Sequence, residues 1–150
     1  MKQAQGFTLI ELTVVLLIVV LGFSVIGTNI SSGNQSSQLK ALTRDLASAL
    51  RYGRGQALIS HDEIIIAINL AENSYKISNR EKVYHFSDEV EVTLLIAQDE
   101  FKDEDTGQLR FYADGSSSGG RITLEWGNLV NVIDVNWLSG KVEINKDDKE

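Results

Sequence analysis

The sequence predicts an α+β fold, in which a long N-terminal helix leads into a second helical segment packed on antiparallel β-sheet. Three observations support this prediction. An unbroken apolar run begins at Phe7, a one-sided apolar stripe occupies residues 39–57, and short segments rich in β-branched residues follow from residue 63 onward. We expect four segments: a leader over 1–6, a membrane-spanning helix over 7–30, an amphipathic helix over 31–60 and a β-rich domain over 61–150.

The composition excludes several classes of protein. The 150 residues carry a formal net charge of −7, and without the first six residues, whose one charge is Lys2, 13 basic residues face 21 acidic ones. A surface of this sign repels phosphate backbones, so we expect no nucleic-acid binding. Cysteine is absent, which excludes disulfides and thiolate metal sites. Nothing in the composition indicates a cofactor.

The apolar run over residues 7–26 is long enough to cross a membrane. Twenty helical residues span roughly 30 Å, the thickness of the hydrocarbon layer of a bilayer. Lys2 precedes the run, so the positive-inside rule leaves the N-terminus in the cytoplasm and the remaining chain outside. An ordinary secretory signal would be cleaved after such a run, but Gly-Thr-Asn-Ile at 27–30 fits the small-residue cleavage pattern poorly.

Glu11 is a carboxylate inside this apolar run. At the centre of a spanning helix a carboxylate costs about 2.5–3.5 kcal/mol, and near the end, where Glu11 lies, it costs less. In one interpretation Glu11 reaches the head groups and gains from the positive end of the helix dipole. In the other it pairs with a cation of another chain, such as the new amine of Phe7 if a peptidase cleaves after Gly6. The residue types alone leave both interpretations open.

Helical periodicity resumes after a polar stretch at 27–37, which is either a loosened part of one long helix or a break. The apolar stripe fits a helix packed on a sheet. Its members are Leu39, Leu42, Leu46, Ala49 or Leu50, Gly53 and Ala57. Gly53 and Gly55 each weaken a helix by up to about 1 kcal/mol relative to alanine, so we expect either close packing or an early helix end there.

The chain beyond residue 61 reads as a series of short, mostly antiparallel strands covering the helix stripe. Gly127-Asn128 and Ser139-Gly140 stand where hairpin turns are needed. The expected strands are 63–70, 74–78, 82–86, 90–96, 109–113, 121–126, 129–137 and 141–145.

Two loops invite a chemical interpretation. The segment 99–107 is dense in carboxylates, but it lacks the regular spacing of a calcium loop, so a solvated surface loop is favoured over a metal site. The segment 114–120 offers serine hydroxyls and glycines, but a serine nucleophile needs a placed base, and nothing brings His61 or His85 toward it. A tight glycine-rich connection between two strands is therefore favoured over a catalytic loop.

The N-terminal segment resembles a known signature. Gly6-Phe7-Thr8-Leu9-Ile10-Glu11-Leu12, followed by the apolar residues 14–18, is similar to the start of type IV pilins and type II secretion pseudopilins. The resemblance implies a pilin-like fold, cleavage after Gly6 and N-methylation of Phe7 by a prepilin peptidase, and pairing of Glu11 with the amine of a neighbouring subunit. It also implies a single-pass protein of the inner membrane of a Gram-negative bacterium, with its C-terminal domain in the periplasm.

Three further segments narrow the resemblance. Residues 111–122, 46–58 and 135–142 are similar to the H-type minor pseudopilins of type II secretion, although Ala113 replaces a common proline and Gly53 a common alanine. The implied role is structural: a non-enzymatic subunit that links a tip complex of other minor pseudopilins to the shaft of the major one. The implied partners are these pseudopilins, the prepilin peptidase and an inner-membrane assembly platform.

Two other functions are weighed against this one. A minor pilin of a true type IV pilus would share the N-terminal signature, and the acidic balance disfavours a DNA-capture role for it but not the pilus itself. A membrane-anchored periplasmic hydrolase would use the serines of 114–120, and it lacks an evident base.

Overall fold

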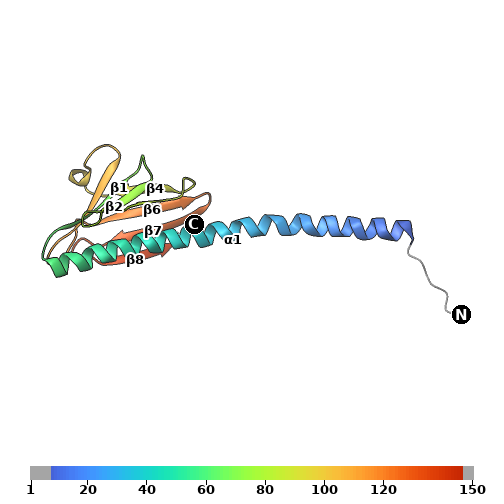
Figure 1. Ribbon diagram of the computed structural model, residues 1–150, viewed down its shortest axis with the longest axis horizontal. Coiled ribbons are helices and arrows are strands. Elements are labelled where there is room, and N and C mark those ends of the chain that lie inside the picture. The colour runs from blue at the N-terminus through green and yellow to red at the C-terminus, as the bar shows by residue number, and fades with distance from the viewer. Residues whose placement is uncertain (1–7, 147–150) are drawn as a thin grey trace. The chain divides into compact units, whose positions relative to one another are not determined.

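The computed structural model describes the backbone of residues 8–146 and the side chains of that range, except those of residues 21–33 and 146. Within this range one long helix is followed by short strands and one 3-10 helix (Figure 1). The elements are α1 Leu9–Ser60, β1 Ile64–Asn69, β2 Ser74–Ile77, β3 Val83–His85, β4 Glu91–Leu95, η1 Gln98–Glu100, β5 Thr106–Phe111, β6 Gly120–Trp126, β7 Leu129–Val135 and β8 Val142–Lys146.

The chain divides into two compact units, Met1–Ser36 and Ser37–Glu150, and α1 contributes to both. The polar stretch at 27–37, whose state the sequence left open, is included in α1. The boundary between the units lies near the predicted junction of the first and second helical segments; the predicted segment limits themselves stay predictions.

The strands of the second unit form two antiparallel four-stranded sheets in the part of the chain that is described. The first has the order β3-β2-β1-β5 and the second the order β4-β6-β7-β8. Every pair in both sheets is antiparallel, and all eight predicted strand segments overlap an observed strand. The predicted α+β fold is therefore confirmed.

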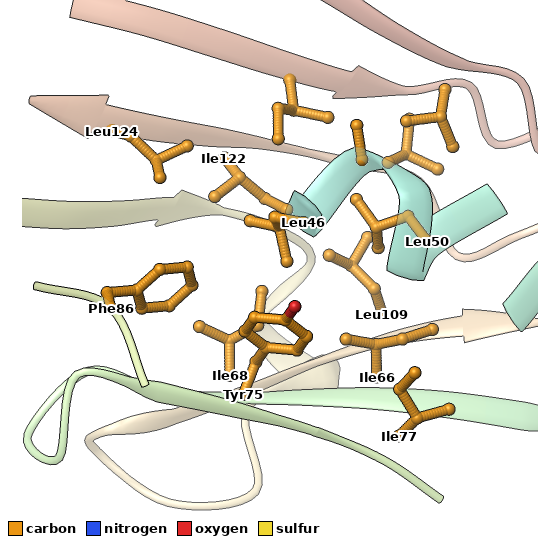
Figure 2. Close-up of a cluster of buried hydrophobic side chains, with 14 of the residues drawn as sticks. Leu46, Leu50, Ile66, Ile68, Tyr75, Ile77, Phe86, Leu109, Ile122 and Leu124 are labelled. Carbon is orange, nitrogen blue, oxygen red and sulfur yellow. The ribbon is translucent and has the colours of Figure 1, made fainter. Parts of the chain in front are cut away.

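The hydrophobic core lies where the predicted helix stripe meets both sheets. Leu46 and Leu50 of α1 are fully buried, and Figure 2 shows them among side chains from the two sheets. The first sheet contributes Ile66 and Leu109, and the second contributes Ile122 and Leu124, all of them at most 1% exposed. Alternation along the strands explains this arrangement, since every second residue of β1 and β5 faces inward.

Gly53 is a close-packing position, which decides between the two expectations for this glycine. A Cβ added at Gly53 would lie 2.6 Å from Ile66 Cδ1 and 3.4 Å from Ile64 Cγ2, so β1 approaches the helix backbone there. A Cβ at Gly55 would meet nothing within 4 Å. The helix does not end at either glycine but continues to Ser60.

The predicted strand boundaries differ from the observed ones by one or two residues in most places, and by three at the start of β5. β5 begins at Thr106 rather than at residue 109, because Thr106 pairs with Asn69 at the end of β1 and Gly107 forms a bridge with Phe101. The predicted acidic loop is correspondingly shorter, and its first part belongs to η1. The polar composition of 106–108 concealed a strand whose length is set by its partner β1.

Candidate functional site

The start of α1 is held by Thr8. The backbone N–H of Glu11 donates to Thr8 O at 3.1 Å and to Thr8 Oγ1 at 3.3 Å, and the N–H of Leu12 donates to Thr8 O at 3.3 Å. A threonine followed three residues later by a glutamate is the sequence signature of a capping box. Thr8 therefore satisfies N–H groups that a helix N-terminus leaves without partners.

Glu11 lies in the first turn of α1 with its side chain exposed. In this position its carboxylate faces the positive end of the helix dipole and is open to a partner from outside the chain. Gly6 and Phe7, the predicted cleavage and methylation site, lie outside the described residues. Thr8 was not singled out by the sequence analysis, although its spacing to Glu11 would have identified it.

The first turns of α1 present an exposed, mostly apolar surface. Every side chain from Thr8 to Val20 is exposed, and Leu9 and Ile10 are 83% and 72% exposed. A helix that is apolar on all sides requires lipid or other protein around it. Among the residues whose side chains are described, no helix is both long enough and apolar enough to cross a membrane.

The serine hydroxyls of the loop 114–120 form hydrogen bonds with the loop and with the segments beside it. Ser116 donates to Asp114 Oδ1 through both its N–H, at 2.9 Å, and its hydroxyl, at 2.5 Å. Both bonds lower the pKa of the Asp114 carboxyl below its ordinary value, and the bond from the Ser116 hydroxyl has the larger effect. Ser117 is buried and donates to Asn136 O at 3.1 Å, while Ser118 Oγ accepts from the Arg110 N–H at 3.1 Å. The loop is a bonded strand connection, as the favoured interpretation predicted.

Arg54 of α1 ties this loop to the β7–β8 turn. Its Nε donates to Gly115 O at 3.2 Å, and its side chain lies against Gly140. A Cβ at Gly140 would lie 2.3 Å from Gly115 O and 2.9 Å from Arg54 Cδ, and Gly140 has φ of 61°. Glycine is therefore required at this turn both by close approach and by backbone conformation. Arg54, which the sequence analysis did not single out, positions two of the segments that carry the family resemblance.

The acidic segment 99–107 is organised by an ion pair. Arg110 Nε donates to Glu100 Oε2 and Arg110 Nη1 donates to Glu63 Oε1, both at 2.7 Å, and Glu100 is buried. Hydrogen bonds from the Thr106 side chain and the Asp105 and Thr106 backbones lower the pKa of Asp103. No group of three metal-ligating side chains occurs in the described part of the chain.

Two family models match this chain, one over most of the packed domain and one at the N-terminus. The model described as "Type II transport protein GspH" matches residues 42–140, from the packed part of α1 through β1 to β7 and into the β7–β8 turn. The chain belongs to the GspH family. The model described as "Prokaryotic N-terminal methylation motif" matches residues 1–27, the range that contains Gly6, Phe7 and Glu11.

Individual relatives agree with this assignment. A curated type II secretion system protein H from Xanthomonas campestris pv. campestris is 26% identical over 144 residues, which cover 94% of this chain and 83% of that protein. The minor pseudopilin EpsH from the type 2 secretion system of Vibrio cholerae has a similar structure, with a TM-score of 0.60 and 8% identity over 75% of this chain and 99% of that one.

A pilus protein is similar in structure as well. The type IV minor pilin FimU of Pseudomonas aeruginosa matches with a TM-score of 0.56 and 11% identity, covering 74% of this chain and 90% of that one. At such identities both structural matches establish the pilin-like fold alone. The GspH family adds what the fold does not: a structural family of pseudopilins, not known as an enzyme family, whose members assemble with other pseudopilins of type II secretion. Together with the methylation motif, it implies a membrane-anchored periplasmic protein.

Proposed function

We propose that this GspH-family chain is a minor pseudopilin of a type II secretion pseudopilus, joining the tip complex of other minor pseudopilins to the major shaft. The observation that carries the proposal is the family match over residues 42–140, which includes strands β1 to β7 and the loop 114–120. In this role the protein supports export of folded proteins across the outer membrane as a structural subunit. The serine hydroxyls of the loop are bonded to Asp114 in the loop, to Asn136 in the β7–β8 turn and to the Arg110 N–H of β5, which supports a structural rather than a hydrolytic role.

Processing at the N-terminus would supply a cationic partner for Glu11. We expect a prepilin peptidase to cleave between Gly6 and Phe7 and to methylate the new amine of Phe7, as the methylation motif over residues 1–27 suggests. That amine would be a cation four residues before Glu11 in the sequence, and the exposed Glu11 carboxylate lies in the first helical turn. Pairing Glu11 with the Phe7 amine of a neighbouring subunit would offset the cost of a carboxylate in an apolar setting and fix the axial position of the two chains.

The apolar start of α1 supports assembly from the inner membrane. Its exposed side chains at 9–20 would exchange lipid contacts for contacts with the helices of other pseudopilins, so that little apolar area meets water during extraction. An inner-membrane assembly platform is the expected partner in that step. The domain beyond residue 37 would remain in the periplasm throughout.

Deletion of the gene tests the proposal directly. We expect export of folded exoproteins to stop while twitching motility and transformation continue, with complementation by the intact gene restoring export. The FimU-like fold makes the type IV pilus the appropriate comparison. Loss of twitching or transformation with normal export would contradict the proposal and assign the chain to a type IV pilus.

A further inference from the structure

A groove of about 460 Å³ lies between α1 and the open edge of the first sheet, within the second unit of the chain. It belongs neither to the N-terminal assembly segment nor to the loop 114–120. Its lining residues come from α1, from β2 and from the segment that forms β3. Those that shape the binding surface are Asp45 and Tyr52 of α1, Tyr75 of β2, and Lys82, Tyr84 and Phe86 of the β3 segment.

Aromatic rings form the floor of this groove. Tyr75 and Tyr84 stack with ring centroids 4.9 Å apart, and the Phe86 ring lies 5.4 Å from Tyr75 (Figure 2 shows Tyr75 and Phe86). Tyr75 and Phe86 are buried, whereas Tyr84 and Tyr52 are only half-buried. The accessible faces of Tyr84 and Tyr52 therefore offer apolar surface to a bound side chain.

Two cations, Arg80 and Lys82, border the aromatic floor. The Arg80 guanidinium lies 4.0 Å from the centroid of Tyr52 and donates to the Tyr84 hydroxyl at 3.3 Å, and Lys82 Nζ lies 4.8 Å from the centroid of Tyr84. No ion pair joins either cation to a carboxylate among the described residues. Because residues 61–150 hold 19 acidic and 9 basic side chains, potential partners are abundant, and the two cations nevertheless rest on rings.

The third feature is the free edge of β3. The Phe86 N–H donates to Asn73 O at 2.8 Å, so Asn73 and Phe86 form a hydrogen-bonded pair. Tyr75 and Tyr84, two positions further along the same register, form the next such pair. In an antiparallel ladder hydrogen-bonded pairs alternate, so Val83 and His85 direct their backbone groups away from β2. No other described strand pairs with β3 on that side, and Val83 is 42% exposed. Such an edge is a template for one more strand.

We propose that this groove binds an extended acidic segment of another filament subunit, which pairs with β3 as an additional strand. Every second side chain of the added strand would face the groove. These side chains would lie beside Lys82, Tyr84 and Phe86, which are the groove-facing residues of the β3 segment. An apolar side chain beside Tyr84 would fill the aromatic floor, and a carboxylate two residues away would meet Lys82, with Arg80 adjacent. The expected recognition pattern is therefore an acidic residue and an apolar residue separated by one position.

The charge of the groove favours this partner over others. Asp45, the one carboxylate among the described lining residues, lies on α1, across the groove from the β3 edge. Lys82 lies over Tyr84 of β3, beside the edge where an added strand would run, and Arg80 lies between Tyr84 of β3 and Tyr52 of α1. The identification of the partner as a filament subunit rests on the proposed function, whereas the β3 edge, the rings and the cations do not.

Site-specific photo-cross-linking in the cells that produce the full chain tests the proposal. The photoreactive residue p-benzoyl-phenylalanine replaces Val83 in one strain and His85 in a second, since both lie on the open edge. A third strain carries it at Leu16, an exposed apolar position of α1 that reports filament assembly independently. Cross-linked peptides are sequenced by mass spectrometry. We expect Val83 or His85 to capture a segment of another pseudopilin with the acidic and apolar spacing given above.

Charge variants complete the test. Lys82→Glu is expected to lower the cross-linking yield at the β3 edge at least about threefold, because an exposed ion pair is replaced by a like-charge contact. Lys82→Arg should retain the yield, and Lys102→Glu, an equal charge change at another exposed lysine, should leave it unchanged. A basic captured segment, or a yield indifferent to Lys82→Glu, would overturn the proposal.

The Leu16 strain separates the two hypotheses. Cross-links at Leu16 to other pseudopilins without any at Val83 or His85 would refute the groove and preserve the proposed function. Capture of an acidic segment at the β3 edge, with no pseudopilin captured at Leu16, would support the groove as a docking site and contradict the filament assignment. Loss at all three positions would overturn both.

Discussion

Asn131 Nδ2 of β7 donates a 3.0 Å hydrogen bond to Thr43 Oγ1 of α1, and the Thr43 hydroxyl in turn donates to Leu39 O at 2.7 Å. Asn131 is 7% exposed and Thr43 is 1% exposed. A polar contact at this depth fixes the position of the second sheet along the helix, because any shift of either element would leave buried polar groups without partners.

Replacing Thr43 with valine should destabilise the protein by about 1–3 kcal/mol, because the shape is retained while the Asn131 amide loses its acceptor. Urea unfolding of the detergent-solubilised chain measures the change. The double variant Thr43→Val/Asn131→Leu should recover part of the loss, since both polar partners are then removed. Equal destabilisation by the single and double variants would show that the pairing is not the cause.

Gly53 and Gly55 offer a matched pair on one helix. Gly53→Leu should destabilise the domain by about 1–3 kcal/mol or more, because its Cβ would already lie 2.6 Å from Ile66 Cδ1. Gly55→Ala should stabilise it by about 0.5–1 kcal/mol, because its Cβ meets open space and alanine is the better helix former. Thermal unfolding of the two variants beside the wild type decides both expectations. Similar effects of the two changes would contradict the packing described for β1.

Phe7 should be the N-terminal residue of the mature chain and should carry an N-methyl group. Intact-mass and peptide mass spectrometry of protein purified from its own cells measure both modifications. The Gly6→Leu variant should accumulate with Met1 still present, because a bulky side chain replaces the glycine at the cleavage position. A mature wild-type chain that begins at Met1 would contradict both filament hypotheses.

Replacing Glu11 with alanine should leave membrane insertion intact and reduce incorporation into the pseudopilus, because the acceptor for the neighbouring amine is lost. Membrane fractionation measures the first property, and filament shearing with immunoblotting measures the second. Thr13→Val is the control in the same turns, since the Thr13 hydroxyl only donates to Ile10 O within the helix. If the Glu11 variant assembled as well as the Thr13 variant, the pairing role would be refuted.

Tyr75 should make the stability of the protein fall at high pH. Burial, followed by the charge of Asp45, raises the pKa of Tyr75 to about 12 from its ordinary value of 10. Below pH 10 the phenol is neutral in both states, and above it the unfolded chain ionises first, so stability is lost as the pH rises toward 12. At pH 11 we expect a loss of about 1 kcal/mol relative to pH 8 that is absent in Tyr75→Phe, measured by urea unfolding. An identical pH dependence of the two proteins would refute it.

Local patterns predicted the secondary structure because each element of this domain carries its own signal. The run of β-branched residues in 64–68 marks β1, and the spacing of Leu39, Leu46 and Leu50 marks the buried face of α1. The glycines at 127 and 140 marked the two hairpin turns, and both have φ near 60°.

The sequence could not reveal which strand joins which sheet. β4 follows β3 in the chain but pairs with β6, a choice determined by packing among distant residues rather than by local composition. The acidic segment 99–107 was ambiguous for a similar reason. The pairing of Glu100 with Arg110 depends on two residues ten positions apart meeting across a turn. The groove beside β3 likewise exists only once α1 and the first sheet are packed together.

The distribution of strands between the sheets constrains how this domain acquires its structure. After β3 the chain crosses from the first sheet to the second at β4, returns at β5 and crosses again at β6. β1 lacks one of its neighbours until β5 is available, and β4 has no neighbour until β6 is available. Neither sheet is therefore complete without a segment that emerges after part of the other. A translocating chain would fold in one cooperative step, late in its passage across the membrane, rather than sheet by sheet.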